Sequence, residues 1–429
     1  MYANKISSVK ARQLIDCNGR PVIEVDVITE DGSLGRSGAS TGTSVGKNES
    51  VVLRDGDPKL FAGLSVFKAI ENIKEYIEPA LVGMDVTDQK GIDQRLLELD
   101  GTPNKEKLGG NTINAASFAA ARAGAAYTRQ PFYRYMALGE IKTHFAPALN
   151  LINGGTYYGI TQPFQEFMLI PRNVDTFMEA VQVGVEVFYK VGELIEKYRK
   201  QPAITGNYCG YGAPSDDPSV IFDILMEAVA QTGYQNKACF AMDCAASEFY
   251  DEQKGLYLYR GKYADRDEII TILSGLCTKY PIGFVEDALE EEDFEGFRLA
   301  SQRIEAAVIG DDFLCTSIER AKKAVNIGAV KGMIVKPNQV GTLTETLDTV
   351  QFMKDNGLLI VASGRAGGVL DDPTTDLAVA VGAQMLKTGA PRSGERVISL
   401  NDGIRIEEEL DFKVKPFNVS VLEGFSRFD

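Results

Sequence analysis

Charged side chains end a series of short apolar runs in the second half of the chain. Three carboxylates end the earlier runs, at Asp243, Glu286 and Asp311. Two lysines end later runs, at Lys336 and Lys387. After the first interval the endings recur about every 25 residues, which is the length of a strand, a helix and their loops in a (β/α) unit. Because the C-terminal ends of parallel barrel strands meet on one face, we expect all five side chains at one barrel mouth.

Three carboxylates on one rim repel one another unless positive charge lies among them. An all-oxygen cluster suits Mg2+ better than Zn2+, so the acids predict a magnesium site. A single acid at a strand end is more simply a helix cap, but three in succession, followed by Lys336, favour metal binding. Lys336 could act as a general base if burial lowers its pKa, although the nearby carboxylates oppose this. Lys387 could instead stay charged and hold a substrate carboxylate.

The chain before these runs has a different organisation, which predicts a separate domain of residues 1–133. Residues 22–29 alternate apolar and polar side chains after a turn-forming segment, as in a β-hairpin. From residue 63 to 126 the apolar period becomes helical, so strands followed by helices form an α+β unit. The glycine-rich loop at 37–48 could close over a ligand or could simply connect two elements. Strands and helices then alternate in a second domain, residues 134–429.

Composition and charge narrow the possible partners. The 429 residues are 44% apolar and 24% charged, as in an ordinary globular protein. The net charge of -15 disfavours nucleic acid and anionic membrane surfaces, because both bind basic faces, but it permits a small anionic substrate in a cleft. Six scattered cysteines without a CxxC pair predict reduced thiols. With no signal-peptide core and no membrane-length apolar run, we expect a soluble, cytoplasmic protein.

Several segments, which span nearly the whole chain in the right order, resemble the enolase (phosphopyruvate hydratase) family. They are residues 16–24, 37–42, 99–105, 165–168, 243–249, 286–287, 311–312, 336–343, 387–391 and 405–410. The resemblance implies an α/β fold, a (β/α)8-type barrel of enolase kind with an N-terminal α+β capping domain. One early strand and helix of that barrel run against the usual direction. It also implies at least a homodimer, formed through the segments that contain Glu24 and Arg405.

The resemblance implies a Mg2+-dependent carbon-oxygen lyase that dehydrates 2-phosphoglycerate to phosphoenolpyruvate in glycolysis. Asp243, Glu286 and Asp311 match the ligands of a tightly bound Mg2+. Ser40 matches the lid serine that joins a second Mg2+, recruited with the substrate. The substrate is then a small anion that carries both a phosphate and a carboxylate.

The same resemblance assigns roles to groups around the substrate. Lys336 matches the base that removes the proton beside the substrate carboxylate, and Lys387 matches a carboxylate-binding lysine. Arg365, with Ser363 in the same segment, matches the phosphate site. Glu166 matches the partner of the glutamate that helps to expel the substrate hydroxyl, so the resemblance makes it a catalytic residue that contacts the substrate.

Four positions depart from the family pattern. Tyr157 stands where the family has a histidine, and Cys209 lies closest to the place of the glutamate in Gly-Asp-Glu-Gly-Gly. Gly364 and Ala366 replace the histidine and the second serine of Ser-His-Arg-Ser. The lid is also several residues longer than usual. Because the metal ligands and the base are kept, we predict a working enzyme in which proton abstraction is intact.

The identity of the acid stays open between Glu166, Tyr157 and Tyr208. Three hypotheses follow for the whole chain. It dehydrates 2-phosphoglycerate, it forms an ene-diolate from a different phospho- or phosphono-hydroxy acid, or it is a non-catalytic binding or scaffold protein on this fold. The only histidine, His144, lies outside every motif, and we expect it to be structural or exposed.

Overall fold

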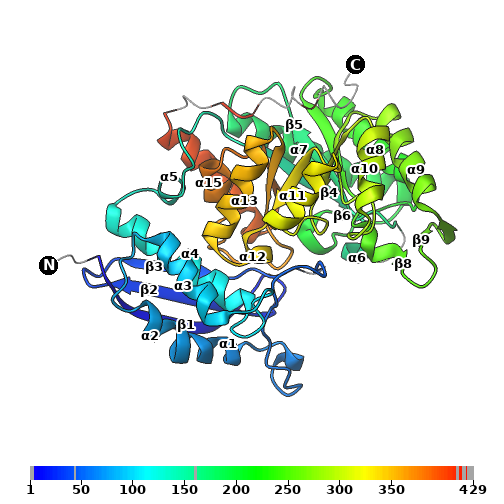
Figure 1. Cartoon of the computed structure of the whole chain (residues 1–429). Coiled ribbons are helices and arrows are strands. Elements are labelled where there is room, and N and C mark those ends of the chain that lie inside the picture. The colour runs from blue at the N-terminus through cyan, green and yellow to red at the C-terminus, as the bar shows by residue number, and fades with distance from the viewer. Residues whose placement is uncertain (1–3, 43–44, 159–161, 412–414, 418–421, 423–429) are drawn as a thin grey trace.

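The computed structural model describes residues 4–42, 45–158, 162–411, 415–417 and 422. A smaller N-terminal domain lies against a larger barrel (Figure 1). Contacts of the segment 40–50 with Asn338, Arg365 and Glu291 place this domain over the end of the barrel where the parallel strands finish. Among the described residues, no helix is both long and apolar enough to cross a membrane.

The N-terminal domain is a three-stranded antiparallel sheet covered by helices. The strands β1 (Ile6–Ile15), β2 (Pro21–Thr29) and β3 (Leu34–Gly38) pair in that order, so the predicted hairpin is confirmed and gains a third strand. The helical segments are η1 (Phe61–Gly63), α1 (Phe67–Asn72), η2 (Ile73–Ile77), α2 (Glu78–Leu81), α3 (Gln89–Asp100) and α4 (Gly110–Thr128). The alanine-rich helix α4 packs on β2 and β3. Its close approach requires Gly35, where an added Cβ would lie 2.0 Å from the Ala119 carbonyl oxygen.

Eight strands form the closed barrel, and its sheet closes where β15 pairs with β4. They are β4 (Ala146–Asn153), β5 (Glu166–Pro171), β7 (Ala238–Asp243), β11 (Ile282–Glu286), β12 (Ala307–Gly310), β13 (Gly332–Val335), β14 (Leu359–Ser363) and β15 (Met385–Gly389). β5 pairs antiparallel with both β4 and β7, whereas the other neighbours pair in parallel. The barrel with one reversed early strand is therefore confirmed. The short strand β6 (Tyr211–Gly212) pairs with β4 outside the barrel.

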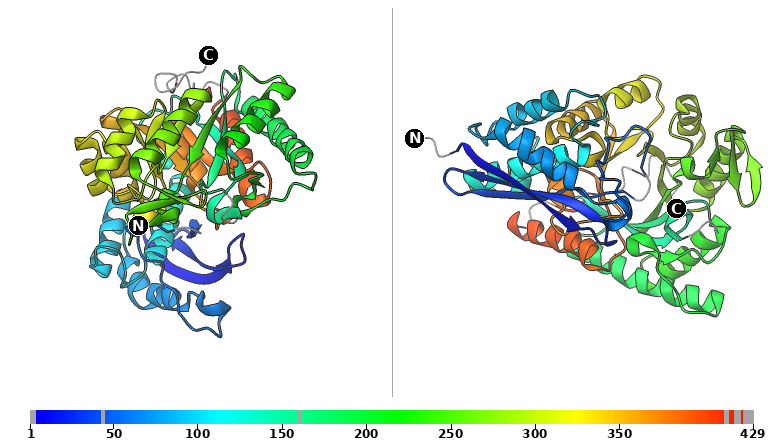
Figure 2. Two further views of the ribbon diagram at one scale, coloured as in Figure 1. Left: turned by 90° about the vertical axis from the view of Figure 1, so that its right-hand side faces the viewer. Right: turned by 90° about the horizontal axis from the view of Figure 1, so that it is seen from below.

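Helices surround the barrel, as the two views in Figure 2 show. The longer ones are α7 (Phe177–Arg199), α8 (Pro218–Thr232), α9 (Arg266–Lys279), α10 (Phe294–Arg303), α11 (Ile318–Asn326), α13 (Leu343–Asp355), α14 (Thr374–Ala380) and α15 (Gly394–Glu409). The short segments are α5 (Phe132–Tyr135), α6 (Gly155–Tyr158), η3 (Asn207–Cys209), η4 (Ala246–Phe249) and α12 (Pro337–Val340). A separate small sheet contains β8 (Tyr250–Asp251), β9 (Leu256–Tyr259) and β10 (Lys262–Ala264). α5 spans the domain boundary that the sequence predicts at residue 133, and that boundary stays a prediction.

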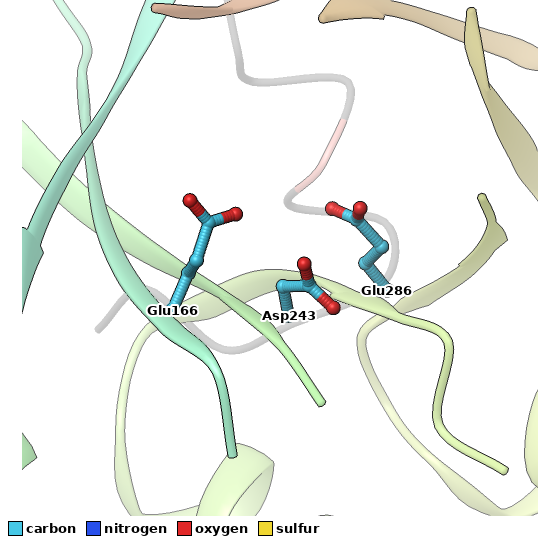
Figure 3. A group of neighbouring side chains, drawn as sticks. All are labelled: Glu166, Asp243 and Glu286. Atoms are coloured by element: carbon cyan, nitrogen blue, oxygen red, sulfur yellow. The ribbon is translucent and has the colours of Figure 1, made fainter. Parts of the chain in front are cut away.

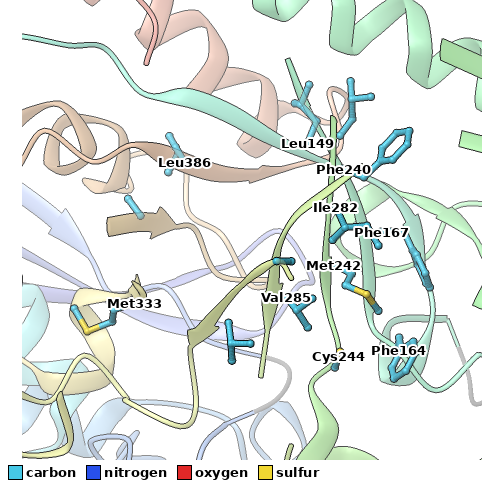
Figure 4. Packing of buried hydrophobic residues seen from close by; sticks show 14 of the residues in the cluster. Leu149, Phe164, Phe167, Phe240, Met242, Cys244, Ile282, Val285, Met333 and Leu386 are labelled. Carbon is cyan, nitrogen blue, oxygen red and sulfur yellow. The ribbon is translucent and has the colours of Figure 1, made fainter. Parts of the chain in front are cut away.

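Alternate residues of the barrel strands enter two different apolar clusters. On β7, Cys239 and Ala241 belong to the cluster inside the barrel, whereas Phe240 and Met242 join the layer between strands and helices. Figure 4 shows part of that outer layer, including Phe240 and Met242. This alternation follows from the period of two in a β-strand and decides which side chains can reach the barrel axis.

Candidate active site

The interior positions of the strands continue into the predicted site residues. Cys239 and Ala241 on β7 point inward, so Asp243, two residues further on, shares their side of the strand. The same step of two leads from inward-facing strand residues to the other site residues at this mouth. These residues are Glu166, Glu286, Asp311, Lys336, Ser363 and Lys387. The barrel therefore brings the three predicted carboxylates and both lysines to one mouth.

Lys387 lies among three buried carboxylates. Its Nζ is 2.6 Å from Glu166 Oε2, 3.4 Å from Asp243 Oδ2 and 2.7 Å from Glu286 Oε2. Figure 3 shows the carboxylates of Glu166, Asp243 and Glu286 directed into one shared space. Each of the three offers an oxygen, and these oxygens lie within 4.8 Å of one another. Gln165 adds a hydrogen bond from Nε2 to Asp243 Oδ2, at 3.3 Å.

Asp311 occupies the next part of the rim. Lys336 Nζ forms a short ion pair with Asp311 Oδ2, and Gln339 Nε2 donates to Asp311 Oδ1 at 2.9 Å. Asp311 also belongs to a second group of acids, with Asp287 and Asp312. Both oxygens of Asp287, however, accept backbone N–H groups from residues 311 and 312, so that carboxylate holds the loop after β12. The oxygen cluster around Lys387 thus contains two of the three predicted ligands plus Glu166.

Burial and mutual repulsion disfavour the ionised forms of Glu166 and Glu286. Burial, followed by the charge of Asp243, raises the pKa of Glu286 well above its ordinary value. Burial also raises the pKa of Glu166, against the opposing effect of Lys387. In Lys387 burial lowers the pKa and the three carboxylates raise it, and the result is a pKa well above its ordinary value. Lys387 is therefore a charged group that offsets part of this negative charge.

The cluster fits a divalent cation. Its donors are all carboxylate oxygens, which Mg2+ prefers. Glu166 Oε1 is buried and has no hydrogen-bond partner among the described residues, so one oxygen of the three acids lacks the partner that buried polar atoms normally have. Three carboxylates also exceed the single charge of Lys387, which leaves negative charge for a cation to balance.

Lys336, the predicted base, is held in its protonated form by its partner. Burial lowers its pKa, but the Asp311 charge raises it, and the combined shift is upward. Asp311, the partner of Lys336, shifts in the opposite direction. Burial raises its pKa, but the charges of Lys336 and Lys387 lower it, and the combined shift is downward. A cation that shared the charge of Asp311 would therefore favour the neutral form of Lys336.

The loop after β3 lies over this mouth. The Ser40 carbonyl accepts a hydrogen bond from Asn338 Nδ2 at 3.1 Å, and the backbone of Thr41 pairs with Gly367. Residues 43 and 44 of the expected lid lie outside the described residues. Further on, Lys47 pairs with Glu252, and its backbone N–H donates to Glu291 Oε2 at 2.9 Å. The extra lid residues from 45 onward therefore contact the barrel loops.

Glu49 is a buried lid residue that the sequence did not single out. Its two oxygens accept from Arg365, with Nη1 at 2.9 Å and Nη2 at 3.1 Å, and the side chains are only 2% and 4% exposed. Asn338 Oδ1 accepts from the same Arg365 Nη1 at 3.1 Å. The predicted phosphate-binding arginine is thus fixed by the lid. Nothing in the sequence pairs these two residues, because 316 positions separate them.

A small cavity lies between the two lysines and the lid. Its lining comprises Gly42, Tyr157, Glu166, Tyr208, Asp243, Lys336, Ser363, Gly364, Arg365, Ala366 and Lys387. Most of the predicted substrate-binding residues therefore surround one space. Cys209 is not among the lining residues, and its Sγ lies 4.0 Å from Glu395 Oε1 instead. Tyr208, the residue before Cys209, lines the cavity instead.

The sequence analysis expected His144 to be structural or exposed, and the structure shows that it is structural. It is fully buried, and its ring lies 4.5 Å from the rings of both Phe145 and Phe177. Nε2 contacts the Gly403 carbonyl oxygen at 3.0 Å. These partners lie outside the cavity lining.

Comparisons with known proteins agree with this geometry. Residues 6–136 match the family model for the enolase N-terminal domain, and residues 143–420 match the enolase C-terminal TIM barrel domain. The chain is 40% identical to an enolase of Methanococcus maripaludis strain C7 over 422 residues, which cover 96% of this chain and 99% of that protein. It is 40% identical to an enolase of Methanopyrus kandleri over 411 residues, covering 95% and 96%. An enolase of Methanocaldococcus jannaschii is 39% identical over 407 residues, again covering 95% and 96%.

Proposed function

The chain belongs to the enolase family, and from this premise we propose a Mg2+-dependent phosphopyruvate hydratase that converts 2-phosphoglycerate to phosphoenolpyruvate and water. As a family member it is a hydro-lyase. One observation supports the proposal for its site. Three carboxylates and two lysines, each at the end of a different barrel strand, lie together at one mouth of the barrel.

We propose that Asp243, Glu286 and Asp311 hold the tightly bound Mg2+, and that Ser40 joins a second ion recruited with the substrate. The buried carboxylate oxygens support the first site. A bound divalent cation would supply positive charge beside the substrate carboxylate. It would also share the charge of Asp311, which otherwise keeps Lys336 protonated.

The proposed reaction needs one base and one acid. Lys336 removes the proton next to the substrate carboxylate, and the electrons of that C–H bond become the new carbon-carbon double bond. The adjacent C–O bond breaks, and its electrons leave with the hydroxyl oxygen, which takes up a proton to form water. Glu166 is the proposed group on the leaving-hydroxyl side, since it lines the same cavity as Lys336 and its buried Oε1 has no hydrogen-bond partner among the described residues.

The remaining proposed contacts hold the anionic ends of the substrate. Lys387 binds the carboxylate, and its charge is assured by the acids around it. Arg365 and Ser363 bind the phosphate, and both line the cavity. Tyr157, Gly364 and Ala366 line the same cavity, so the departures from the family pattern alter its walls.

The test is direct turnover. Purified protein with 2-phosphoglycerate and Mg2+ should produce phosphoenolpyruvate, followed by its ultraviolet absorbance. Lys336→Ala should lower kcat at least about 100-fold, the contribution of a positioned base. Lys354→Ala is the matched control, because this half-buried lysine donates to the Val381 carbonyl away from the cavity and should leave kcat unchanged. If no phosphoenolpyruvate forms at high enzyme concentration, 2-phosphoglycerate is excluded as the substrate.

A second substrate class is favoured by one observation. Gly364 and Ala366 flank Arg365 with almost no side chain, so the predicted phosphate site offers fewer donors than the family pattern. A different phospho- or phosphono-hydroxy acid would still lose its proton to Lys336. Solvent deuterium exchange into such acids, in the absence of turnover of 2-phosphoglycerate, would identify this alternative.

We also propose a homodimer and a cytoplasmic location. Glu24 is buried beside Arg12 and Arg36 on the N-terminal sheet, whereas Arg405 is exposed and pairs with Asp402. The six cysteines all lie among the described residues and form no disulfide, as expected in a reducing compartment. Light scattering that gives the monomer mass of 46.7 kDa would contradict the dimer.

A further inference from the structure

Tyr208 lies where the cavity meets the segment that carries Arg365. It sits in η3 and is only 4% exposed. Its backbone is left-handed, with φ of 63°, and the next residue, Cys209, has φ of 65°. Two successive residues with side chains in this region are strained, and such strain persists only where the surroundings fix it.

The Tyr208 carbonyl accepts from the Ala390 N–H at 3.2 Å and its ring lies 5.9 Å from that of Tyr157, while its other side-chain contacts lead to the segment after β14. The Tyr208 hydroxyl donates to the Gly364 carbonyl at 2.9 Å. The guanidinium carbon of Arg396 lies 4.2 Å from the centre of the tyrosine ring. Arg396 in turn donates to the carbonyls of Arg365 and Ala366, each at 2.7 Å. Three consecutive carbonyls are therefore bound by Tyr208 or by the arginine stacked on it.

Gly364 and Tyr208 are complementary in shape. A Cβ added at Gly364 would lie 3.6 Å from the Tyr208 hydroxyl oxygen and 3.9 Å from Arg396 Nη1, which is ordinary contact. The Lys387 carbonyl oxygen lies at the same 3.9 Å, and of these three neighbours the Tyr208 hydroxyl is the nearest to the added Cβ. We therefore expect Tyr208 to limit the size of a side chain at 364. Tyr208, the neighbour of the departure at Cys209, and the departure at Gly364 are 156 positions apart in sequence and form one contact in the structure.

We infer that Tyr208 is a positioning residue for Arg365, and this inference rests on the proposed function of Arg365 as the phosphate-binding group. The guanidinium end of Arg365 is fixed by Glu49 and Asn338. Its backbone end is fixed by Arg396 and, through the adjacent Gly364, by Tyr208. Tyr208 acts by holding the carbonyls, and the substrate phosphate contacts the arginine.

The first experiment removes one hydrogen bond. Tyr208→Phe keeps the ring under Arg396 but leaves the buried Gly364 carbonyl without its donor. We expect KM for 2-phosphoglycerate to rise about 5- to 50-fold, with kcat within about threefold of wild type. Tyr133→Phe is the matched control, because Tyr133 is 2% exposed and its hydroxyl donates to Glu409 at 3.1 Å, outside the cavity. It should leave KM unchanged, and equal KM values for both variants would overturn the inference.

A binding measurement separates this inference from the proposed function. Calorimetric titration with inorganic phosphate uses the same arginine and needs no turnover. If wild type binds phosphate and Tyr208→Phe binds it at least about fivefold more weakly, the inference holds even when 2-phosphoglycerate is not turned over. Equal phosphate affinity in the two proteins, or no binding by wild type, would overturn it.

The shape argument has its own test. Gly364→Ala should retain phosphate affinity within about twofold, whereas Gly364→His should lose it, because an alanine Cβ makes only ordinary contact with Tyr208 and the larger side chain needs additional space. Adding Tyr208→Ala to Gly364→His should weaken binding by less than the product of the two single effects, as expected for residues in contact. Strictly multiplicative effects would contradict the proposed contact. Thermal midpoints of the single variants identify any that fail to fold, and Tyr208→Phe then decides.

Discussion

The ion pair between Glu49 and Arg365 gives the sharpest stability prediction. Both side chains are almost completely buried, and the two hydrogen bonds span the lid and the barrel. Glu49→Ala leaves the Arg365 guanidinium buried without its carboxylate. Breaking one side of such a pair typically costs about 3 to 5 kcal/mol, since the remaining buried charge loses the counter-ion that it contacts directly. For a domain of this size we expect the thermal midpoint to fall by roughly 5 to 10 °C.

The assay is thermal unfolding with and without inorganic phosphate. Because the Arg365 guanidinium of this variant can pair with an added anion in place of Glu49, phosphate should raise the thermal midpoint of Glu49→Ala more than that of wild type. The control is Glu292→Ala, which breaks the pair with Arg320 at 3.0 Å. Glu292 is half exposed, so this loss should be about 1 kcal/mol or less and should not respond to phosphate.

A double variant checks the physical cause. In Glu49→Ala with Arg365→Met no buried charge is left, so the midpoint should recover part of the loss seen in Glu49→Ala alone. The reasoning is refuted if Glu49→Ala is as stable as Glu292→Ala, or if removing the arginine as well only adds to the loss. Either result would mean that the guanidinium does not depend on the lid carboxylate.

Three further predictions concern charge elsewhere. Mg2+ should raise the thermal midpoint of wild type, by about 2.7 kcal/mol of stabilisation at a concentration 100 times the dissociation constant, and Glu286→Ala should abolish that rise. Burial lowers the pKa of His144 from 6.5 to about 4. The unfolded chain therefore takes up a proton first as the pH falls, and the stability difference between wild type and His144→Asn should shrink by about 2 kcal/mol from pH 7 to pH 5 in denaturant titrations. Lys47→Ala breaks exposed pairs with Glu252 and Glu290 and should cost less than about 1 kcal/mol, an effect that vanishes in high salt.

The strands of the barrel could be predicted from the sequence because burial on both faces leaves a continuous apolar run. The run that ends at Asp243 matches β7, and the run that ends at Glu286 matches β11. Strand β3 and the small sheet of β8 to β10 were not predicted. They are short and partly exposed, so they lack both the length and the apolar pattern that mark a strand.

The site could be predicted as a set of residues but not as a set of contacts. Strand ends identified Asp311 and Lys336, whose direct ion pair depends on the stagger of β12 against β13. Lys387 was expected to meet a substrate carboxylate, and in the structure it contacts three protein carboxylates. Glu49 was missed altogether, because a lid contact depends on how two domains dock, and no local pattern records that.

The four departures from the family pattern lie at places where they can coexist with unchanged positions of the proposed metal ligands and the proposed base. Asp243 ends β7, and Lys387 lies within β15, where side-chain direction follows from strand alternation and the closed barrel. Tyr157 lies in α6, and Tyr208 lies in η3. Gly364 follows β14 in a loop. Loop positions can change without moving a strand, and a new side chain such as Tyr208 can be matched by the loss of one such as that at Gly364. The proposed base and metal ligands are therefore tied to the barrel, whereas the walls of the proposed phosphate and leaving-hydroxyl sites are free to change together.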